Sequence, residues 1–295
     1  MLIPDWLLSR YEKLIRRLQA GRLHHGLLLT GPAGIGKHVL ARELAKTILC
    51  KNNSTTGACG QCQACLLYEA GSHPDMAELV SDKQLGVDAI RQGIGRLNST
   101  AQLSGNKVLV IPKAEKMTEA AANALLKTLE EPTNNTFILL LTNRPQQLLA
   151  TIVSRCEKHI FPAPVTADAL KWLEQQGVKD ASEALLHAYG GAPFAIVESL
   201  HQDKGLEYRA FTEGLDSLLA GSKDAVSLSI DWQEHAERVV GWLQQYMHSQ
   251  CIKYPDKQTI HLYEACTQAR KILQNPGINK SMILSCLLAE IKQTG

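Results

Sequence analysis

The sequence predicts an α/β domain with a parallel β-sheet, followed by two helical domains. In the N-terminal half, short apolar runs alternate with segments of helical periodicity, which is the pattern that βαβ units produce. After residues 161–164 (FPAP), apolar residues recur only at helical spacing, because two prolines in three residues end the last extended run. Aromatic residues make up only 5% of the chain, so the core must consist mainly of Leu, Ile, Val and Ala, as in helices and buried parallel strands.

Five short apolar runs, each bounded by Gly, Pro, Asn or a charged turn, are the expected strands. They are residues 26–30 (GLLLT), 76–80 (MAELV), 107–112 (KVLVIP), 136–142 (TFILLLT) and 158–161 (KHIF). Two of the helices between them have clear boundary residues. We expect Asp5 to cap a first helix that Gly21 ends, and Thr118 to cap another that Pro132 stops.

These patterns predict three domains. We expect the α/β domain over residues 1–163, a small helical domain over 164–204 and a larger helical domain over 205–295. A polar linker at residues 201–205 separates the two helical domains. Short amphipathic helices are expected at 166–176, 181–189 and 193–200, and longer ones around Leu215, Val239, Leu262 and Ile283.

Charge and hydropathy exclude several classes of protein. The 295 residues carry 31 Lys and Arg against 29 Asp and Glu, a net charge of +2, which lacks the basic excess of an autonomous nucleic-acid-binding protein. No stretch reaches the roughly 18 consecutive apolar residues of a membrane-spanning helix, and the N-terminus lacks the layout of a signal peptide. We therefore expect a cytoplasmic protein with no membrane partner.

Residues 31–38 (GPAGIGKH) directly follow the first expected strand and match the phosphate-binding loop through Lys37. Lys37 supplies a positive charge, and glycines let backbone N–H groups converge on phosphate oxygens at a helix N-terminus. The match ends at His38, which stands where a Ser or Thr hydroxyl would bind Mg²⁺. The imidazole of a histidine is better suited to softer metals. ATP binding and a vestigial glycine-rich turn both remain open. The glycines concerned are Gly31, Gly34 and Gly36.

ATP hydrolysis needs a second part, an acidic residue at the end of a neighbouring strand that holds Mg²⁺ and orients water. Pro112 and Lys113 stand at that point, and a lysine there would repel the metal. Glu115 is the nearest acid, but it could reach back only through a distorted turn. We predict that this chain by itself does not hydrolyse ATP appreciably.

Four cysteines within sixteen residues form the most specific metal signal: Cys50, Cys59, Cys62 and Cys65. Four thiolates make a closed tetrahedral zinc site, which is structural because no coordination position is left for water. An iron–sulfur cluster and ordinary buried thiols are the alternatives. Zinc is favoured because the fourth cysteine lies upstream and no ferredoxin-like Cys-Pro ending is present. The remaining cysteines, Cys156, Cys251, Cys266 and Cys286, are expected to be ordinary thiols.

Residues 121–132 (AANALLKTLEEP), followed by 137–143 (FILLLTN) and 154–156 (SRC), resemble the clamp-loader branch of the AAA+ ATPases. The cysteine insertion at 50–65 and the triplet 73–75 (HPD) strengthen this resemblance. It implies an AAA+ (P-loop NTPase-like) α/β domain with a zinc module, then a helical lid and an all-α collar domain that oligomerises. Two features are similar to those of a noncatalytic subunit of the bacterial DNA polymerase III clamp loader: His38 in the glycine-rich loop, and the absence of an acidic pair after the third expected strand.

The resemblance also implies roles for single residues. Arg155 would reach across a subunit interface to ATP bound by a neighbour, where a guanidinium can fork onto phosphate oxygens. The alternative is an ordinary surface arginine in a turn. Thr142 and Asn143 match a polar sensor position, although strand termination explains them equally well. Pro193 takes the place of a second sensor arginine found in active relatives, which adds a third defect in ATP use.

The function implied by the resemblance is a noncatalytic clamp-loader subunit. Such a subunit acts as a rigid stator and helps load a sliding clamp onto primed DNA during replication. It belongs to the DNA-directed DNA polymerase holoenzyme, a nucleotidyltransferase, by association only. Its partners would be the gamma/tau motor subunits and the delta subunit and, through the complex, the clamp and primer–template DNA.

Two other functions stay open at this point. An active ATPase motor subunit of the same machine would have to bypass Pro112 and Lys113. A zinc-dependent nucleic-acid-binding module working alone would need a stronger basic patch than a net charge of +2 provides.

Overall fold

The computed structural model of the chain describes residues 3–81, 83–103, 105–178, 180–202, 206–273, 275 and 277–293. The chain divides into two compact units, Met1–Pro164 and Val165–Gly295. This boundary lies one residue from the one predicted between the α/β and helical parts. The expected linker at 201–205 begins inside a helix that runs to Gln202, and residues 203–205 lie outside the described residues. The division of the helical part into two domains stays a prediction.

The first unit contains a five-stranded parallel sheet in the order β2-β3-β4-β1-β5. Its strands confirm the predicted sheet. Two match their expected bounds, β2 and β3 end earlier, and β5 begins and ends one residue earlier. The strands are β1 (Gly26–Thr30), β2 (Met76–Glu78), β3 (Lys107–Ile111), β4 (Thr136–Thr142) and β5 (Glu157–Ile160).

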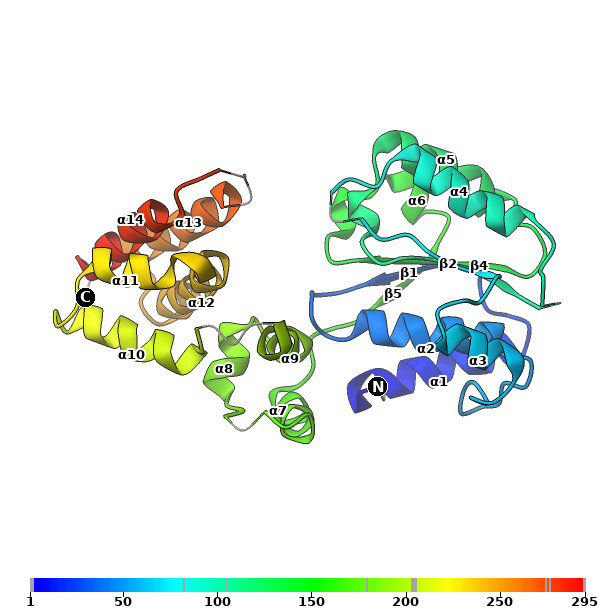
Figure 1. Cartoon of the computed structure of the whole chain (residues 1–295), viewed down its shortest axis with the longest axis horizontal. Helices are drawn as coiled ribbons and strands as arrows, with labels where there is room; N and C mark the ends of the chain where they lie inside the picture. The colour runs from blue at the N-terminus through cyan, green and yellow to red at the C-terminus, as the bar shows by residue number, and fades with distance from the viewer. Residues whose placement is uncertain are drawn as a thin grey trace. The chain divides into compact units, whose positions relative to one another are not determined.

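Helices cover both faces of this sheet (Figure 1). The first face carries α1 (Asp5–Gln19), α2 (Lys37–Leu49) and α3 (Gln63–Glu69), and the second carries α4 (Val87–Asn98), α5 (Glu119–Glu130) and α6 (Ala150–Val153). Successive residues of a strand point to opposite faces, so Leu27 and Leu29 enter the core beneath α1 and α2, whereas Leu28 enters the core beneath α5. Burial on both faces explains why β1 and β3 are apolar without alternation.

The ends of two helices test the capping predictions. Thr118 caps α5 as predicted, because its hydroxyl oxygen accepts a hydrogen bond from the backbone N–H of Ala121 at 3.2 Å. Gly21 follows α1 with φ 63°, the left-handed conformation expected of a residue that ends a helix. The prediction for Asp5 is wrong. Pro4 holds the N-cap position and Asp5 is the first helical residue, where its negative charge still faces the positive end of the helix dipole.

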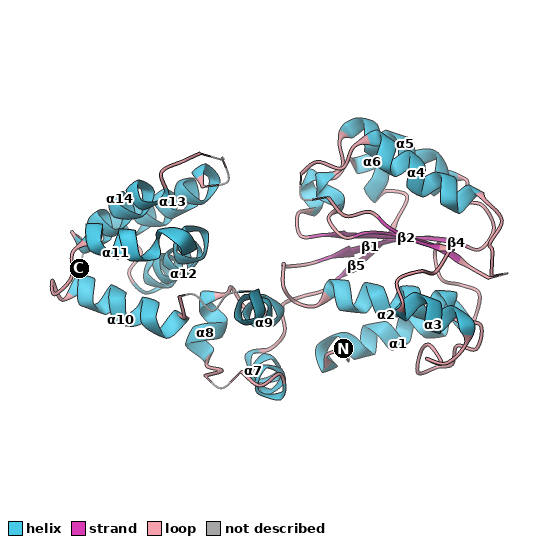
Figure 2. Ribbon diagram, viewed as in Figure 1, coloured by secondary structure: helices cyan, strands magenta, loops and turns pink. Residues whose placement is uncertain are grey.

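The second unit is entirely helical in its described residues (Figure 2). The three short helices predicted after residue 164 and the longer ones that follow are all present. They are α7 (Thr166–Gln175), α8 (Glu183–Ala188), α9 (Pro193–Gln202), α10 (Tyr208–Leu219), α11 (Ala225–Trp232), α12 (Ala236–Lys253), α13 (Lys257–Ile272) and α14 (Lys280–Lys292). No helix among the described residues is both long enough and apolar enough to cross a lipid bilayer.

An aromatic cluster forms the core between α10, α11 and α12. The ring of Phe211 lies 5.4 Å from that of Trp232 and 5.1 Å from that of Trp242, measured between centroids. Gly214 lets α10 approach this cluster closely, because a Cβ atom there would lie 2.5 Å from the Trp232 ring. The packing therefore requires a residue without a side chain at position 214.

We expect Gly214→Ala to lower the free energy of unfolding by about 1–3 kcal/mol, because the added methyl group overlaps the Trp232 ring. Gly241→Ala is the matched control in α12, where nothing lies within 4 Å of the added atom, and higher helix propensity should raise stability by about 0.5–1 kcal/mol. Urea unfolding of the full chain, followed by tryptophan fluorescence, measures both. Equal effects of the two substitutions would contradict the packing described here.

Candidate functional site

The loop between β1 and α2 has the conformation of a phosphate-binding turn. Gly34 and Gly36 have φ 68° and 94°, left-handed values that residues with a side chain rarely adopt. A Cβ atom on Gly31 would lie 2.2 Å from the carbonyl oxygen of Phe161, which follows β5. Strand packing and turn geometry therefore both require glycine, as the motif predicted.

The Lys37 side chain is folded into this loop. Its exposed fraction is 6%, and its ammonium group donates to the carbonyl oxygens of Gly31 at 2.8 Å and of Pro32. It also donates to the Asn143 amide oxygen at 2.7 Å, just beyond the end of β4. The structure thus joins the loop to the predicted sensor position. Burial lowers the pKa of Lys37 to about 8, and the nearby negative charge of Glu115 partly opposes this effect.

The residues after β3 differ in part from the sequence-based expectation. Neither the partly buried Pro112 nor the exposed Lys113 has a side-chain oxygen that could bind Mg²⁺. Glu115 lies in a 3₁₀ turn over Ala114–Lys116. From the sequence, Glu115 was expected to approach the phosphate-binding loop only through a tight turn of this kind. One carboxylate oxygen of Glu115 is buried with no hydrogen-bond partner among the described residues. The side chain of His38 is exposed.

Trp6 is a contact to the loop that sequence reasoning missed. Its indole N–H donates to the carbonyl oxygen of Ile35 at 3.0 Å, which ties the first turn of α1 to the glycine-rich turn. The only signal for this contact in the sequence is the tryptophan itself, because its indole N–H needs an acceptor wherever the ring is buried.

The four predicted cysteines converge on one point. Their sulfur atoms all lie within 4.8 Å of one another, and those of Cys59 and Cys62 are 3.5 and 3.9 Å from that of Cys50. A tetrahedral ion with metal–sulfur bonds of about 2.3 Å would place its sulfur ligands about 3.8 Å apart. Cys50 follows the last residue of α2, and Cys65 lies in the first turn of α3. The cluster therefore has the donors and the size of a tetrahedral metal site.

Backbone N–H groups lower the pKa values of Cys59 and Cys62 and so favour the thiolate form that binds metals at these two positions. Burial of Cys62 opposes ionisation, but N–H groups of Cys65 and Lys51 and the neighbouring thiols bring its pKa down to about 6. Burial raises the pKa of Cys65 to about 12. A bound cation would stabilise all four thiolates together, so metal binding and proton release are coupled here.

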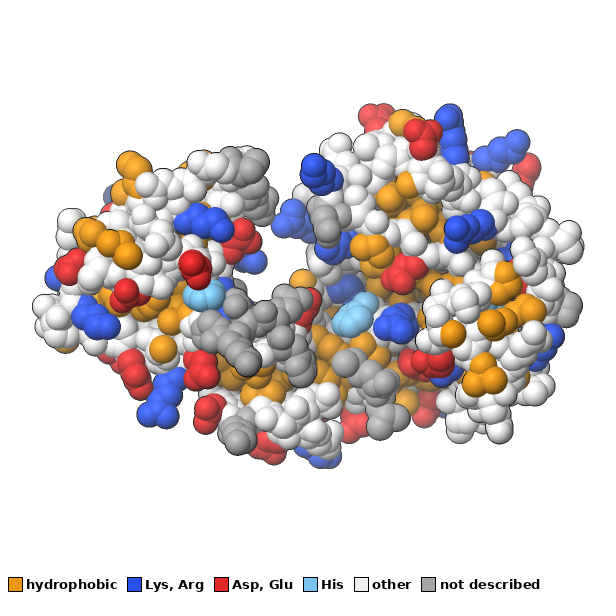
Figure 3. Space-filling view, viewed as in Figure 1, with side chains coloured by type: hydrophobic (Ala, Val, Ile, Leu, Met, Phe, Trp, Pro, Cys, Tyr) orange, Lys and Arg blue, Asp and Glu red, His pale blue; other side chains and the backbone are white. Residues whose placement is uncertain are grey.

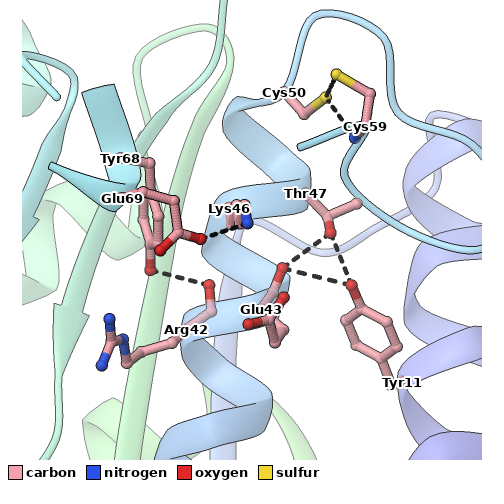
Figure 4. Close-up of polar contacts among 9 residues, drawn as sticks. All are labelled: Tyr11, Arg42, Glu43, Lys46, Thr47, Cys50, Cys59, Tyr68 and Glu69. Carbon is pink, nitrogen blue, oxygen red and sulfur yellow. Dashed lines mark hydrogen bonds and ion pairs between the residues drawn. The ribbon is translucent and has the colours of Figure 1, made fainter. Parts of the chain in front are cut away.

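Helices α1, α2 and α3 hold the cysteine loop in place (Figure 4). The Tyr11 hydroxyl lies 2.8 Å from the Thr47 hydroxyl, and a Cβ atom on Gly57 of the loop would lie 2.7 Å from the same Tyr11 oxygen. Lys46 of α2 forms an ion pair with Glu69 of α3. These contacts fix both helices that carry the outer ligands of the cluster.

His73 and Asp75, which strengthened the family resemblance, have a structural role. The Asp75 carboxylate accepts hydrogen bonds from the backbone N–H groups of Gln102 and Leu103 at 2.8 and 3.0 Å. His73 Nδ1 accepts from the backbone N–H of Asp75 at 3.1 Å, and both side chains are buried. The pair fixes the loop that leads into β3.

Arg155 lies in the turn between α6 and β5. Its Nη2 atom is 2.5 Å from Glu130 Oε1 at the end of α5, and its Nη1 atom donates to the carbonyl oxygen of Thr151 at 3.0 Å. All strands run parallel, so a residue just before β5 lies at the opposite edge of the sheet from the loop that follows β1. At about 3.3 Å per residue, the five residues of β1 separate these edges by about 16 Å.

We expect Lys37 to titrate with a midpoint near pH 8, because burial penalises its charged form. Glu115→Gln should lower the midpoint further, since it removes the charge that favours the ammonium, whereas Glu119→Gln on the exposed side of α5 should not. Between pH 8 and 10.5, Lys37 is protonated in the unfolded chain but largely neutral in the folded chain. The free energy of unfolding should therefore increase as the pH rises through this range. NMR titration of ¹³C-labelled lysine in the full chain measures the midpoint, and a value near 10.4 would refute the buried geometry.

Comparisons with known proteins agree on one family. The family model described as "DNA polymerase III, delta subunit" matches residues 8–164. A DNA polymerase III subunit delta' from Pseudomonas aeruginosa is 42% identical over 237 residues, covering 78% of this chain and 71% of the relative. The Escherichia coli subunit delta' is 41% identical over 203 residues, covering 67% of this chain and 61% of the relative.

A more distant subunit type and a solved structure are also similar. The DNA polymerase III subunit gamma/tau of Mycobacterium bovis is 34% identical over 216 residues, covering 70% of this chain and 35% of that protein. The fold matches the crystal structure of a gamma subunit-related protein from Thermotoga maritima with a TM-score of 0.53 and 21% identity, covering 96% and 98% of the two chains. With the family model spanning more than half of its residues, the chain belongs to the DNA polymerase III delta-prime family.

Proposed function

We propose that this chain is a noncatalytic clamp-loader subunit that supplies Arg155 to an ATP site of a neighbouring subunit. In this role it acts as a stator, together with gamma/tau and delta subunits, while the complex loads a sliding clamp onto primer–template DNA. The observation that carries the proposal is the position of Arg155. It lies at the opposite edge of the sheet from its own phosphate-binding loop, and the five residues of β1 separate these edges by about 16 Å.

Arg155 has the chemistry and the accessibility that such a role needs. Its side chain is 34% exposed, and a guanidinium keeps its charge at all physiological pH values. A positive fork of this kind stabilises the charge that develops on a transferred γ-phosphate. Its position at the edge away from its own loop supports a role toward a nucleotide bound by another chain.

The chain's own loop supports a role without ATP hydrolysis. Lys37 makes its hydrogen bonds to carbonyl oxygens of the loop and to Asn143. His38 and Lys113 stand where hydrolysing relatives have a Mg²⁺-binding hydroxyl and an acid. Glu115 is the acid that a motor subunit would have to use instead. Mg²⁺-dependent ATP turnover by the purified chain would favour the motor-subunit alternative.

Nucleic-acid binding by the isolated chain has little support. On the face that Figure 3 shows, Lys and Arg side chains are interspersed with Asp and Glu, in line with the net charge of +2. A protein that neutralises many phosphates needs a basic stripe or patch instead. We therefore assign any contact with DNA to the assembled complex.

We propose further that the four-cysteine cluster holds a structural zinc ion. Cys50, Cys59, Cys62 and Cys65 supply the four thiolates, and the separations of 3.5 and 3.9 Å suit a single ion. An iron–sulfur cluster places several iron and sulfide ions between its thiolates, so it would hold them further apart than a single ion does. When bound, zinc would cross-link the loop between α2 and α3 and take no part in chemistry.

The purified full chain should contain about one zinc ion, because four converging thiolates bind it with no position left open. Cys65→Ser should lower the zinc content and the midpoint of thermal unfolding. Cys286→Ser, at an exposed position in α14, is the control and should change neither. Elemental analysis measures the metal directly, and iron with visible absorbance would contradict the zinc proposal.

Arg155→Ala should sharply lower clamp- and DNA-stimulated ATP hydrolysis in a complex reconstituted with gamma/tau and delta subunits. Loss of a trans-acting arginine costs about 10³-fold at the site that it serves. Arg209→Ala is the control, since Arg209 also forms an exposed ion pair with a glutamate, Glu213, at 3.0 Å. Unchanged turnover in an intact complex containing Arg155→Ala would show that this arginine is only structural.

A further inference from the structure

We propose that Glu130 is a positioning residue for Arg155: its carboxylate holds the guanidinium where it can meet a phosphate on the neighbouring subunit. This inference rests on the proposed function of Arg155. Neither the charge pattern nor the helix pattern of the sequence singled out Glu130, because residues 130–132 (EEP) also fit a solvated helix end.

Two helices each supply one acceptor to the guanidinium. Glu130 is the last residue of α5, and its Oε1 atom lies 2.5 Å from Arg155 Nη2. Thr151 belongs to α6, and its carbonyl oxygen accepts from Nη1 at 3.0 Å. A planar group held at both terminal nitrogens keeps one orientation, whereas a single contact would let it rotate.

The pair contributes more to orientation than to stability. The exposed fractions of the Arg155 and Glu130 side chains are 34% and 47%, and half-exposed ion pairs add little to the stability of a fold. A surface arginine that is not held samples many rotamers. Fixing the side chain before the subunits meet removes the entropy that it would otherwise lose on reaching the phosphate.

The place of Glu130 in its own helix supports the same conclusion. It ends α5, where the helix dipole is negative and a carboxylate is unfavourable. Arg155 compensates this by placing a positive charge beside the helix end. The next residue, Glu131, is exposed and forms no ion pair among the described residues, so the two neighbouring glutamates differ in their contact with Arg155.

The held arginine can still bind a phosphate. A guanidinium carries five N–H donors; Nη2 contacts Glu130, and Nη1 donates to the Thr151 carbonyl oxygen and, at 3.5 Å, to the Ser154 hydroxyl oxygen. The remaining N–H groups can donate to a phosphate oxygen while Glu130 stays in place. A γ-phosphate carries more negative charge than one carboxylate, so the positive guanidinium still attracts it on its open side.

The test is a double-mutant cycle in the reconstituted complex, with ATP hydrolysis stimulated by clamp and primed DNA. We expect Glu130→Gln to lower kcat by about tenfold, since small misplacement of a catalytic group is costly, and to leave KM for ATP unchanged. The matched control Glu131→Gln should change neither. In the Arg155→Ala background, Glu130→Gln should cause no further loss.

The other outcomes would overturn the inference. If Glu130→Gln lowers turnover equally with and without Arg155, Glu130 acts elsewhere. If turnover rises or is unchanged, the carboxylate restrains Arg155 or is irrelevant to it. The unfolding midpoint of Glu130→Gln should match that of Glu131→Gln, and a large drop would indicate a structural role. If Arg155→Ala itself has no effect, the proposed function fails, and that result is distinct from failure of Glu130 alone.

Discussion

The parallel sheet of the first unit, buried on both faces, is the constraint on which the rest of the structure depends. Because every strand runs the same way, the turns that follow strands gather at one edge and the turns that precede them gather at the other. Lys37 and Asn143 meet at the first edge. Arg155 and Glu130 meet at the second. In the proposed function, the second edge would complete an ATP site of a neighbouring chain.

The two edges differ in how completely their positive side chains, Lys37 and Arg155, are surrounded by hydrogen-bond acceptors of the same chain. At the first edge, burial and three acceptors enclose the Lys37 ammonium, so a phosphate would have to displace contacts that already exist. At the second edge, Arg155 stays partly exposed and keeps donors available. This asymmetry is what a subunit needs if it assists hydrolysis on a neighbour without turning over ATP itself. The cysteine cluster lies between α2 and α3, in the helical layer that also contains α1.

Most of the fold could be predicted because its signals are local. Strand β1 is bounded by turn residues, and Thr118 caps its helix through an atom three residues away. The cysteine set was predictable because close spacing along the chain forces close spacing of the sulfur atoms. The partners of Glu130 and Trp6 could not be assigned from the sequence, because they lie 25 and 29 residues away along the chain. Glu115 was identified from the sequence as the nearest acid, but only the structure showed that its charge acts on Lys37. Asp5 was misassigned because Pro4, also favourable before a helix, precedes it.

The sequence by itself determined the α/β class, the boundary near residue 164, the four-cysteine cluster and the family motifs around Lys37 and Arg155. Periodicity and spacing encode these features within a few residues of one another. Only the tertiary structure decided which charges meet: Lys37 with Asn143 and Arg155 with Glu130. These pairings depend on strand order and on where each helix ends against the sheet. Packing of the whole domain fixes these pairings. Hydrophobic burial sets the register between distant segments, and that register decides which polar side chains meet.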